Sequence, residues 1–209
     1  MIMPSHIHLS VWNSNHSDSC QCTKKVHKSA ISFDINTQLS KLSWDIADGK
    51  LNFFQAEHAF VEITKTKPEN QWKVLVLASL ANLAFCRLFN GDAVAMFVVF
   101  MATIMGYRLK QIMLGYKIDV RIVFICSAVL SSVIAAGACL FSWGTTPDIA
   151  LATSVLYLIP GIPYINSVSD MLDGHYVCAF SRFVDAMILT ACLSTGLCGG
   201  MLLMGLKWL

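Results

Sequence analysis

The sequence predicts an all-α integral membrane protein with five transmembrane helices and a small N-terminal α+β cytoplasmic segment. Three observations favour this fold class. The chain of 209 residues is 56% hydrophobic and only 13% charged, whereas a soluble domain usually carries about 25% charged residues. The charge deficit is concentrated after Gln71. Beyond that residue the chain carries five long apolar runs, and roughly 20 apolar residues are enough to cross a bilayer.

Residues 1–71 are predicted to form the cytoplasmic segment, as a β-hairpin followed by two helices. HIHLSVW and CQCTKKVHK flank the polar stretch NSNHSDS, which is the pattern of two short strands around a turn. The next apolar residues share one helical face at spacings of four, three and four: Ile35, Leu39, Leu42 and Ile46. Asp34 is a candidate N-cap, and Gly49 is a candidate residue just beyond the helix end. A second helix is expected from about Phe53 to Thr66, before Pro68.

Residues 72–209 are predicted to form the transmembrane domain. The expected spans run from Trp72 to Phe89, Ala93 to about Leu109, Ile122 to Pro147, Ile149 to Ser169, and Ala186 to Leu206. Lysine and arginine concentrate before the first span and between the second and third spans, whereas the loop GTTPD between the third and fourth spans carries neither. The positive-inside rule therefore predicts a cytoplasmic N-terminus and an external C-terminus.

The fourth apolar run is interrupted in the stretch LIPGIPYINSVSDMLDG. Pro160, Gly161 and Pro163 fall within four residues, and proline both lacks an N–H and disrupts the carbonyl one helical turn earlier. At 1.5 Å per residue the break lies about 16 to 21 Å into a span that starts at Ile149. Interrupted helices at such depth bind solute in transporters, because the freed amides and carbonyls become ligands. A simple kink without a ligand is the alternative interpretation.

Polar residues follow this break at helical spacing. Asn166, Asp170 and Asp173 would share one face of a resumed helix. Carboxylates near a membrane are often functional when they face a cavity. In the alternative interpretation, Asp170 and Asp173 are solvated residues at a helix end.

Two arginines are candidate partners for an anionic solute. Arg182 lies three residues before Asp185 at the start of the fifth run, and such a pair also serves simply to join helix ends. Arg87 lies one turn from the end of the first span, where a long basic side chain often reaches water instead of a solute.

Little in the sequence indicates a metal, a cofactor or catalysis. The N-terminal cluster contains an HxH and a CxC without the paired spacing of a structural zinc site: His6, His8, His16, Cys20, Cys22 and His27. No GxSxG, P-loop, HExxH or dinucleotide-binding fingerprint is present, so we expect neither an enzyme nor a cofactor. The net charge of +2 indicates no nucleic-acid partner. The remaining cysteines lie in or close to apolar runs and are predicted to be small core or lipid-facing residues.

The stretch LIPGIPYINSVSDMLDGHYVCAFSR resembles the signature of the threonine/serine exporter family. In that family the string P-G-x-P-x-x-N-x-x-x-D-x-x-x-G, followed by an arginine, ends the fourth span and leads to the fifth. Here it falls on Pro160, Gly161, Pro163, Asn166, Asp170, Gly174 and Arg182. The hairpin, WDIADGKLNFFQAEHAFVEI and the first span resemble the cytoplasmic region and first span of the family, so the resemblance covers nearly the whole chain.

The resemblance is closest to the split branch of the family, in which a five-span subunit works with a separate, smaller membrane subunit. Split members are linked to succinate export, and fused members to threonine and serine export. Family members usually carry another helix-rich segment before the hairpin, so either the sequence starts downstream of the natural start codon or the cytoplasmic segment is truly shortened here. The resemblance also implies a multi-pass protein of the bacterial inner membrane.

These observations lead to the hypothesis of a secondary-transport exporter subunit for small carboxylates or hydroxy amino acids. The amides around Gly161 and the side chain of Asn166 would bind the solute. Arg182 or Arg87 would neutralise solute charge, and Asp170 would hold a proton or cation. Five spans cannot contain two equal inverted halves, so a second small membrane subunit or a second copy would complete the path.

Two other hypotheses stay open at this point. In the first, the chain is a structural or regulatory subunit that stabilises a transporting partner, and the prolines only shape a packing kink. In the second, the chain is a membrane enzyme that uses Asp170 and Asp173 with His175 as a base.

Overall fold

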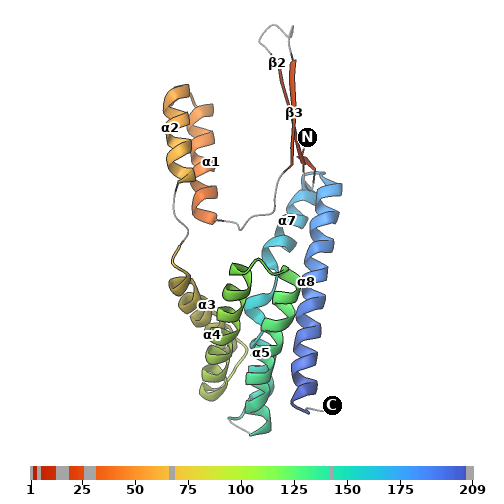
Figure 1. The fold of residues 1–209 in the computed structure, drawn as a ribbon. Helices are drawn as coiled ribbons and strands as arrows, with labels where there is room; N and C mark the ends of the chain where they lie inside the picture. The colour runs from red at the N-terminus through yellow and green to blue at the C-terminus, as the bar shows by residue number, and fades with distance from the viewer. Residues whose placement is uncertain are drawn as a thin grey trace.

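The computed structural model describes residues 2–3, 6–12, 19–25, 32–65, 69–141 and 144–205. Its elements, in chain order, are β1 (Ile2–Met3), β2 (His6–Trp12), β3 (Ser19–Lys25), α1 (Phe33–Ala47), α2 (Phe53–Thr64), α3 (Gln71–Leu88), α4 (Ala93–Gly115), α5 (Val120–Leu140), α6 (Pro147–Thr153), the 3-10 helix η1 (Leu156–Leu158), α7 (Gly161–Leu172) and α8 (Tyr176–Leu203). Figure 1 shows the strands and the α1–α2 pair at one end of a bundle formed by α3 to α8.

The N-terminal strands confirm the predicted hairpin. β2 and β3 pair antiparallel from His6 opposite Lys25 to Trp12 opposite Ser19, and β1 adds to the other edge of β2. The predicted turn NSNHSDS, with His16, and the candidate ligand His27 lie outside the described residues. Within the described ranges no group of three His, Cys, Asp or Glu side chains is placed to hold a metal ion.

The two predicted helices after the hairpin are α1 and α2. The N-cap of α1 is Ser32, whose hydroxyl accepts a hydrogen bond from the Ile35 amide at 3.5 Å. The prediction of Asp34 as the cap was therefore wrong, because the helix begins at Phe33 and Asp34 lies inside its first turn. Gly49 has φ 69° just beyond the helix end, as predicted. Pro68, the predicted stop after α2, lies outside the described residues.

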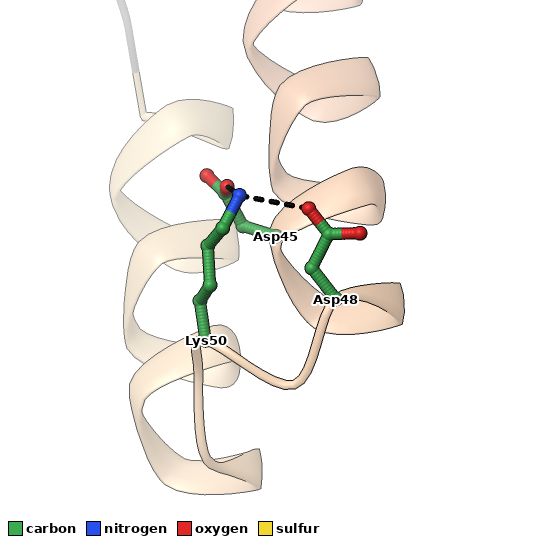
Figure 2. Close-up of polar contacts among 3 residues, drawn as sticks. All are labelled: Asp45, Asp48 and Lys50. Carbon is green, nitrogen blue, oxygen red and sulfur yellow. Dashed lines mark hydrogen bonds and ion pairs between the residues drawn. The ribbon is translucent and has the colours of Figure 1, made fainter.

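The turn between α1 and α2 is held by a lysine that bridges two carboxylates. Figure 2 shows Lys50 Nζ reaching Asp48 at 2.8 Å and Asp45 at 3.3 Å. The hydrogen bonds to Asp48 and then to Asp45 raise the pKa of Lys50. All three side chains are solvent-accessible, so the network positions the turn and contributes little to the free energy of unfolding.

Length and composition qualify α4, α5 and α8 as membrane spans among the described residues, and the bent pair formed by α6–η1 and α7 as a fourth. The helix α3, which matches the first expected span, does not meet the same criteria, so a fifth span stays a prediction. The helix α8 begins at Tyr176, well before the expected start at Ala186. The chain ends at the opposite end of the bundle from the strands (Figure 1).

The most extensive helix contact in the bundle joins α5 and α8. A Cβ atom on Gly196 would lie 2.6 Å from the Ala128 Cβ and 2.7 Å from the Ile125 carbonyl oxygen. One turn later, a Cβ on Gly200 would overlap the Ser132 hydroxyl. Small residues at such positions let two backbones approach closely, and the resulting van der Waals packing favours helix association in lipid.

Candidate functional site

The fourth apolar segment loses α-helical geometry before it reaches the prolines. α6 ends at Thr153, a short turn and η1 follow, and Ile159 is extended with φ −58° and ψ 124°. A residue that precedes proline disfavours the α region, which explains the conformation of Ile159. The two halves, Pro147–Leu158 and Gly161–Leu172, meet at 60°.

The PGIP sequence therefore starts the second half of the segment. Gly161 is the first residue of α7, and Pro163 lies in its first turn, where a missing N–H costs nothing. The Gly161 amide donates to the Ile159 carbonyl at 2.9 Å, so the expected free amide at Gly161 is satisfied. Within the described residues the Ile162 amide is left without an acceptor.

A pocket of about 420 Å³ opens beside this break. The pocket is lined by one face of α3, by Tyr107 of α4, and by Leu156, Tyr157 and Ile159 from the break. Most of the lining is apolar, and its polar side chains are those of Asn82, Tyr107 and Tyr157. An apolar pocket with a few converging polar groups is the usual form of a small-molecule site.

Tyr157 fixes the broken segment to the rest of the bundle. Its hydroxyl lies 2.8 Å from the Ser131 hydroxyl and 3.4 Å from the Ser127 carbonyl oxygen, both on α5. Gly106 on α4 leaves the space for this contact, because a Cβ there would overlap the hydroxyls of Tyr157 and Ser131. The tyrosine ring also packs on Tyr107, with centroids 5.9 Å apart. η1 is thus held between α4 and α5.

Asn82 connects three helices at the base of the pocket. Its Nδ2 donates to the Thr103 hydroxyl of α4 at 2.6 Å and to the Thr153 carbonyl at the end of α6 at 3.2 Å. The side chain is buried, with 2% exposure. In hydrocarbon every backbone polar group needs a partner, and Asn82 supplies one for a carbonyl freed by the break.

The polar residues of α7 lie further along the helix, next to α8. Asp170 Oδ2 is 2.9 Å from Arg182 Nη1, with side-chain exposures of 19% and 46%. Asp170 Oδ2 is buried and has no hydrogen bond of good angle in the described part of the chain. The contact with Arg182 is therefore close enough for an ion pair but is not aligned as a hydrogen bond. Arg182 thus approaches Asp170 on α7, twelve residues earlier in the chain. The side chain of Asn166 is partly buried and makes no hydrogen bond within the described residues.

Arg87 lies away from these residues. It occupies the last turn of α3 and donates through Nη1 to the Gly91 carbonyl at 3.4 Å. That end of the bundle also contains the start of α4 and the end of α8, whereas Asp170 lies near the end where α8 begins (Figure 1). The structure therefore groups Arg182 with Asp170 and leaves Arg87 apart from both.

Comparison with known proteins identifies the family. The family model described as "Putative threonine/serine exporter" matches residues 1–204. The chain belongs to the threonine/serine exporter family. No solved structure matches it.

Curated relatives from three bacteria are similar to this chain. The "Probable succinate transporter subunit YjjP" of Escherichia coli K12 is 27% identical over 88% of this chain and 72% of its own length. The protein with the same description from Klebsiella aerogenes is 28% identical over the same shares. A "Probable threonine/serine exporter" of Mycobacterium tuberculosis is 25% identical over 77% of this chain and 30% of its own length.

The family resemblance of the P-G-x-P string did not point to the residues that line the pocket. Asn82, Tyr107 and Tyr157 were missed, because each lies inside an apolar run and outside that string. One signal could have found Asn82: it is the one amide side chain within the run from Trp72 to Phe89, and polar residues inside membrane segments mark functional sites by default.

Proposed function

We propose that this chain is the subunit of a secondary-transport exporter that moves small carboxylates or hydroxy amino acids across the bacterial inner membrane. Succinate, threonine and serine are the solutes that the names of its relatives suggest. The observation that carries the proposal is the break in the fourth apolar segment beside a pocket of about 420 Å³. Transport at such a site needs binding and movement but no catalysis.

The pair formed by Asp170 and Arg182 would couple solute movement to a proton or a cation. Asp170 is mostly buried and its contact with Arg182 is poorly aligned, so protonation would release the arginine at a small cost in lost hydrogen bonding. A released Arg182 would then be free to neutralise a carboxylate solute. The pair lies on α7 and α8, and α7 is the helix that begins at the break.

A second protein is needed to complete the path. The pocket is open on the side of α3 and the break, where Phe85, Phe89 and Ile159 are each about half exposed. A small membrane subunit of the same exporter, or a second copy of this chain, would close that side. The cytoplasmic N-terminus and external C-terminus are part of the same proposal, supported by the lysine distribution and by the position of the chain ends at opposite ends of the bundle (Figure 1).

Deletion of the chain in its native host tests the proposal. We expect intracellular succinate, threonine or both to rise on deletion and to fall again when the wild-type chain is restored. Asn166→Ala and Asp170→Asn should restore export poorly. Asp173→Asn, a change of the same kind at the exposed end of α7, should restore it fully.

Two results would contradict the proposal. Unchanged levels of both solutes on deletion would remove the exporter function. Full export by an Asp170→Asn chain that reaches the membrane at normal levels would favour a structural subunit that stabilises a transporting partner.

A further inference from the structure

We propose that Asn82 selects the solute, and that its free carbonyl oxygen makes the pocket a site for solutes that bring a hydrogen-bond donor. The inference rests on the proposed export function and adds the chemical class that the pocket prefers. A hydroxy or amino acid carries such a donor in its hydroxyl or ammonium group. A fully ionised dicarboxylate such as succinate carries none.

The orientation of the Asn82 amide follows from its neighbours. The Thr103 hydroxyl donates its proton to the Val99 carbonyl at 2.7 Å, so its oxygen can only accept from Asn82. The second neighbour is the Thr153 carbonyl, which is an acceptor in every case. Both neighbours therefore require the NH₂ group of the amide. The alternative flip would place the Asn82 carbonyl oxygen against two acceptors and is excluded on chemical grounds.

This orientation leaves Oδ1 of Asn82 as the unused group. Within the described residues no donor reaches it, while the side chain is 2% exposed and lines the pocket. Asn82 Oδ1 is not among the buried side-chain atoms that lack a partner in the described residues, which are Ser127 Oγ and Asp170 Oδ2. This oxygen is therefore accessible, on a side chain that lines the pocket, and a solute hydroxyl or ammonium group in the pocket would donate to it.

The rest of the lining agrees with a donor-bearing solute. None of the lining residues is lysine or arginine, so nothing in the pocket wall compensates the second charge of a dianion. The Tyr157 hydroxyl is already engaged by Ser131. Lys110 lies outside the lining but close to Tyr107, with its Nζ 5.5 Å from that ring and 5.1 Å from the Phe124 ring. Its attraction would act on the carboxylate that both solute classes share, and so would not discriminate between them.

A matched pair of solutes tests the inference. Malate and succinate differ by one hydroxyl group, the donor that Asn82 would accept. The assay uses inside-out membrane vesicles of the native host and measures how each solute inhibits uptake of labelled threonine. In wild-type vesicles we expect malate to inhibit at a concentration about tenfold or more below that of succinate, because a site built to hydrogen-bond a hydroxyl rejects the analogue that lacks it.

Two variants separate the acceptor from the helix contacts of Asn82. Asn82→Ala removes Oδ1, so malate and succinate should inhibit threonine uptake at similar concentrations, and the ratio of their inhibitory concentrations should be close to one. Thr103→Val removes an acceptor of the amide hydrogens but keeps Oδ1, so it should lower the uptake rate and preserve the ratio. If Asn82→Ala does not reach the membrane, a wild-type chain that does not prefer malate over succinate still overturns the inference.

The outcomes distinguish the inference from the function on which it rests. The role of Asn82 is overturned if the two solutes inhibit equally, if succinate inhibits more strongly, or if the ratio is unchanged in Asn82→Ala. In each of these cases, uptake of threonine by wild-type vesicles still supports the proposed export function. Absence of uptake of both threonine and succinate in wild-type vesicles overturns the proposed function and this inference together.

Discussion

Substitution of Gly106 by alanine tests whether Tyr157 holds the broken segment in place. The new Cβ would overlap the hydroxyls of Tyr157 and Ser131, so the 2.8 Å hydrogen bond between them would be lost. Such bonds contribute about 0.6 kcal/mol, at most about 1.7, between membrane helices, and overpacking costs about 1–3 kcal/mol more. The gain in helix propensity from glycine to alanine is about 1 kcal/mol. The net expectation is a loss of about 1–3 kcal/mol.

The assay is equilibrium unfolding of the purified protein in mixed micelles, followed by circular dichroism. Gly137→Ala is the matched control, since a Cβ at this helical glycine of α5 meets no atom within 4 Å, and it should be neutral or stabilising. In a Ser131→Ala/Tyr157→Phe background both overlapping hydroxyls are absent, so Gly106→Ala should cost less than half as much. A Gly106→Ala protein as stable as Gly137→Ala, or a cost unchanged in that background, would refute the reasoning.

Two further predictions concern the ends and the core of the bundle. The amides of Thr145 and then Ala95 lower the pKa of Asp92, and each donates to its carboxylate at 2.8 Å. The pKa of Asp92 in the folded protein lies below the unfolded value of about 3.9. The stability that the ionised Asp92 contributes is therefore complete above that pH and is lost as the pH falls through the folded pKa. The melting temperature of the wild type should therefore exceed that of Asp92→Asn at pH 7 and approach it towards pH 3; a constant difference would contradict this. In the core, Gly200→Leu should prevent α5–α8 packing and reduce the amount of folded protein in the membrane, because a Cβ there overlaps Ser132. Gly199→Leu should be tolerated, because a Cβ there would meet one atom at 3.8 Å. Equal yields of the two variants would count against the packing.

Most helices could be predicted from the sequence because their signals are local. Long apolar runs indicated α4, α5 and α8, and α7 begins at Gly161, between the two prolines, and carries Asn166 and Asp170 on one helix as their spacing predicts. The apolar run predicts a later start for α8, at Ala186, because it excludes the charged residues that precede it. In the structure Arg182 belongs to the second turn of α8 and approaches Asp170 on the neighbouring helix.

The pocket could not be predicted because its contacts join distant parts of the chain. Tyr157 enters the bundle where Gly106 on another helix leaves space, and no periodicity in either segment indicates the pairing. The site prediction concentrated on backbone groups at Gly161, since proline and glycine are visible in the sequence. Local turn geometry satisfies that amide, and an unused polar group of the pocket is the side-chain oxygen of Asn82 on α3.

Solute protection of a thiol at the break tests the central claim most directly. In a cysteine-free version of the chain, Ile159→Cys places a thiol at the edge of the pocket, and Ile165→Cys places one on the exposed side of α7; the native side chains are 52% and 70% exposed. The solute is threonine or succinate, whichever accumulates in the deletion strain. If the pocket beside the break binds solute, the solute slows alkylation of the Ile159→Cys variant in membrane vesicles and leaves the Ile165→Cys variant unaffected. Equal alkylation rates of the Ile159→Cys variant with and without solute would contradict the account.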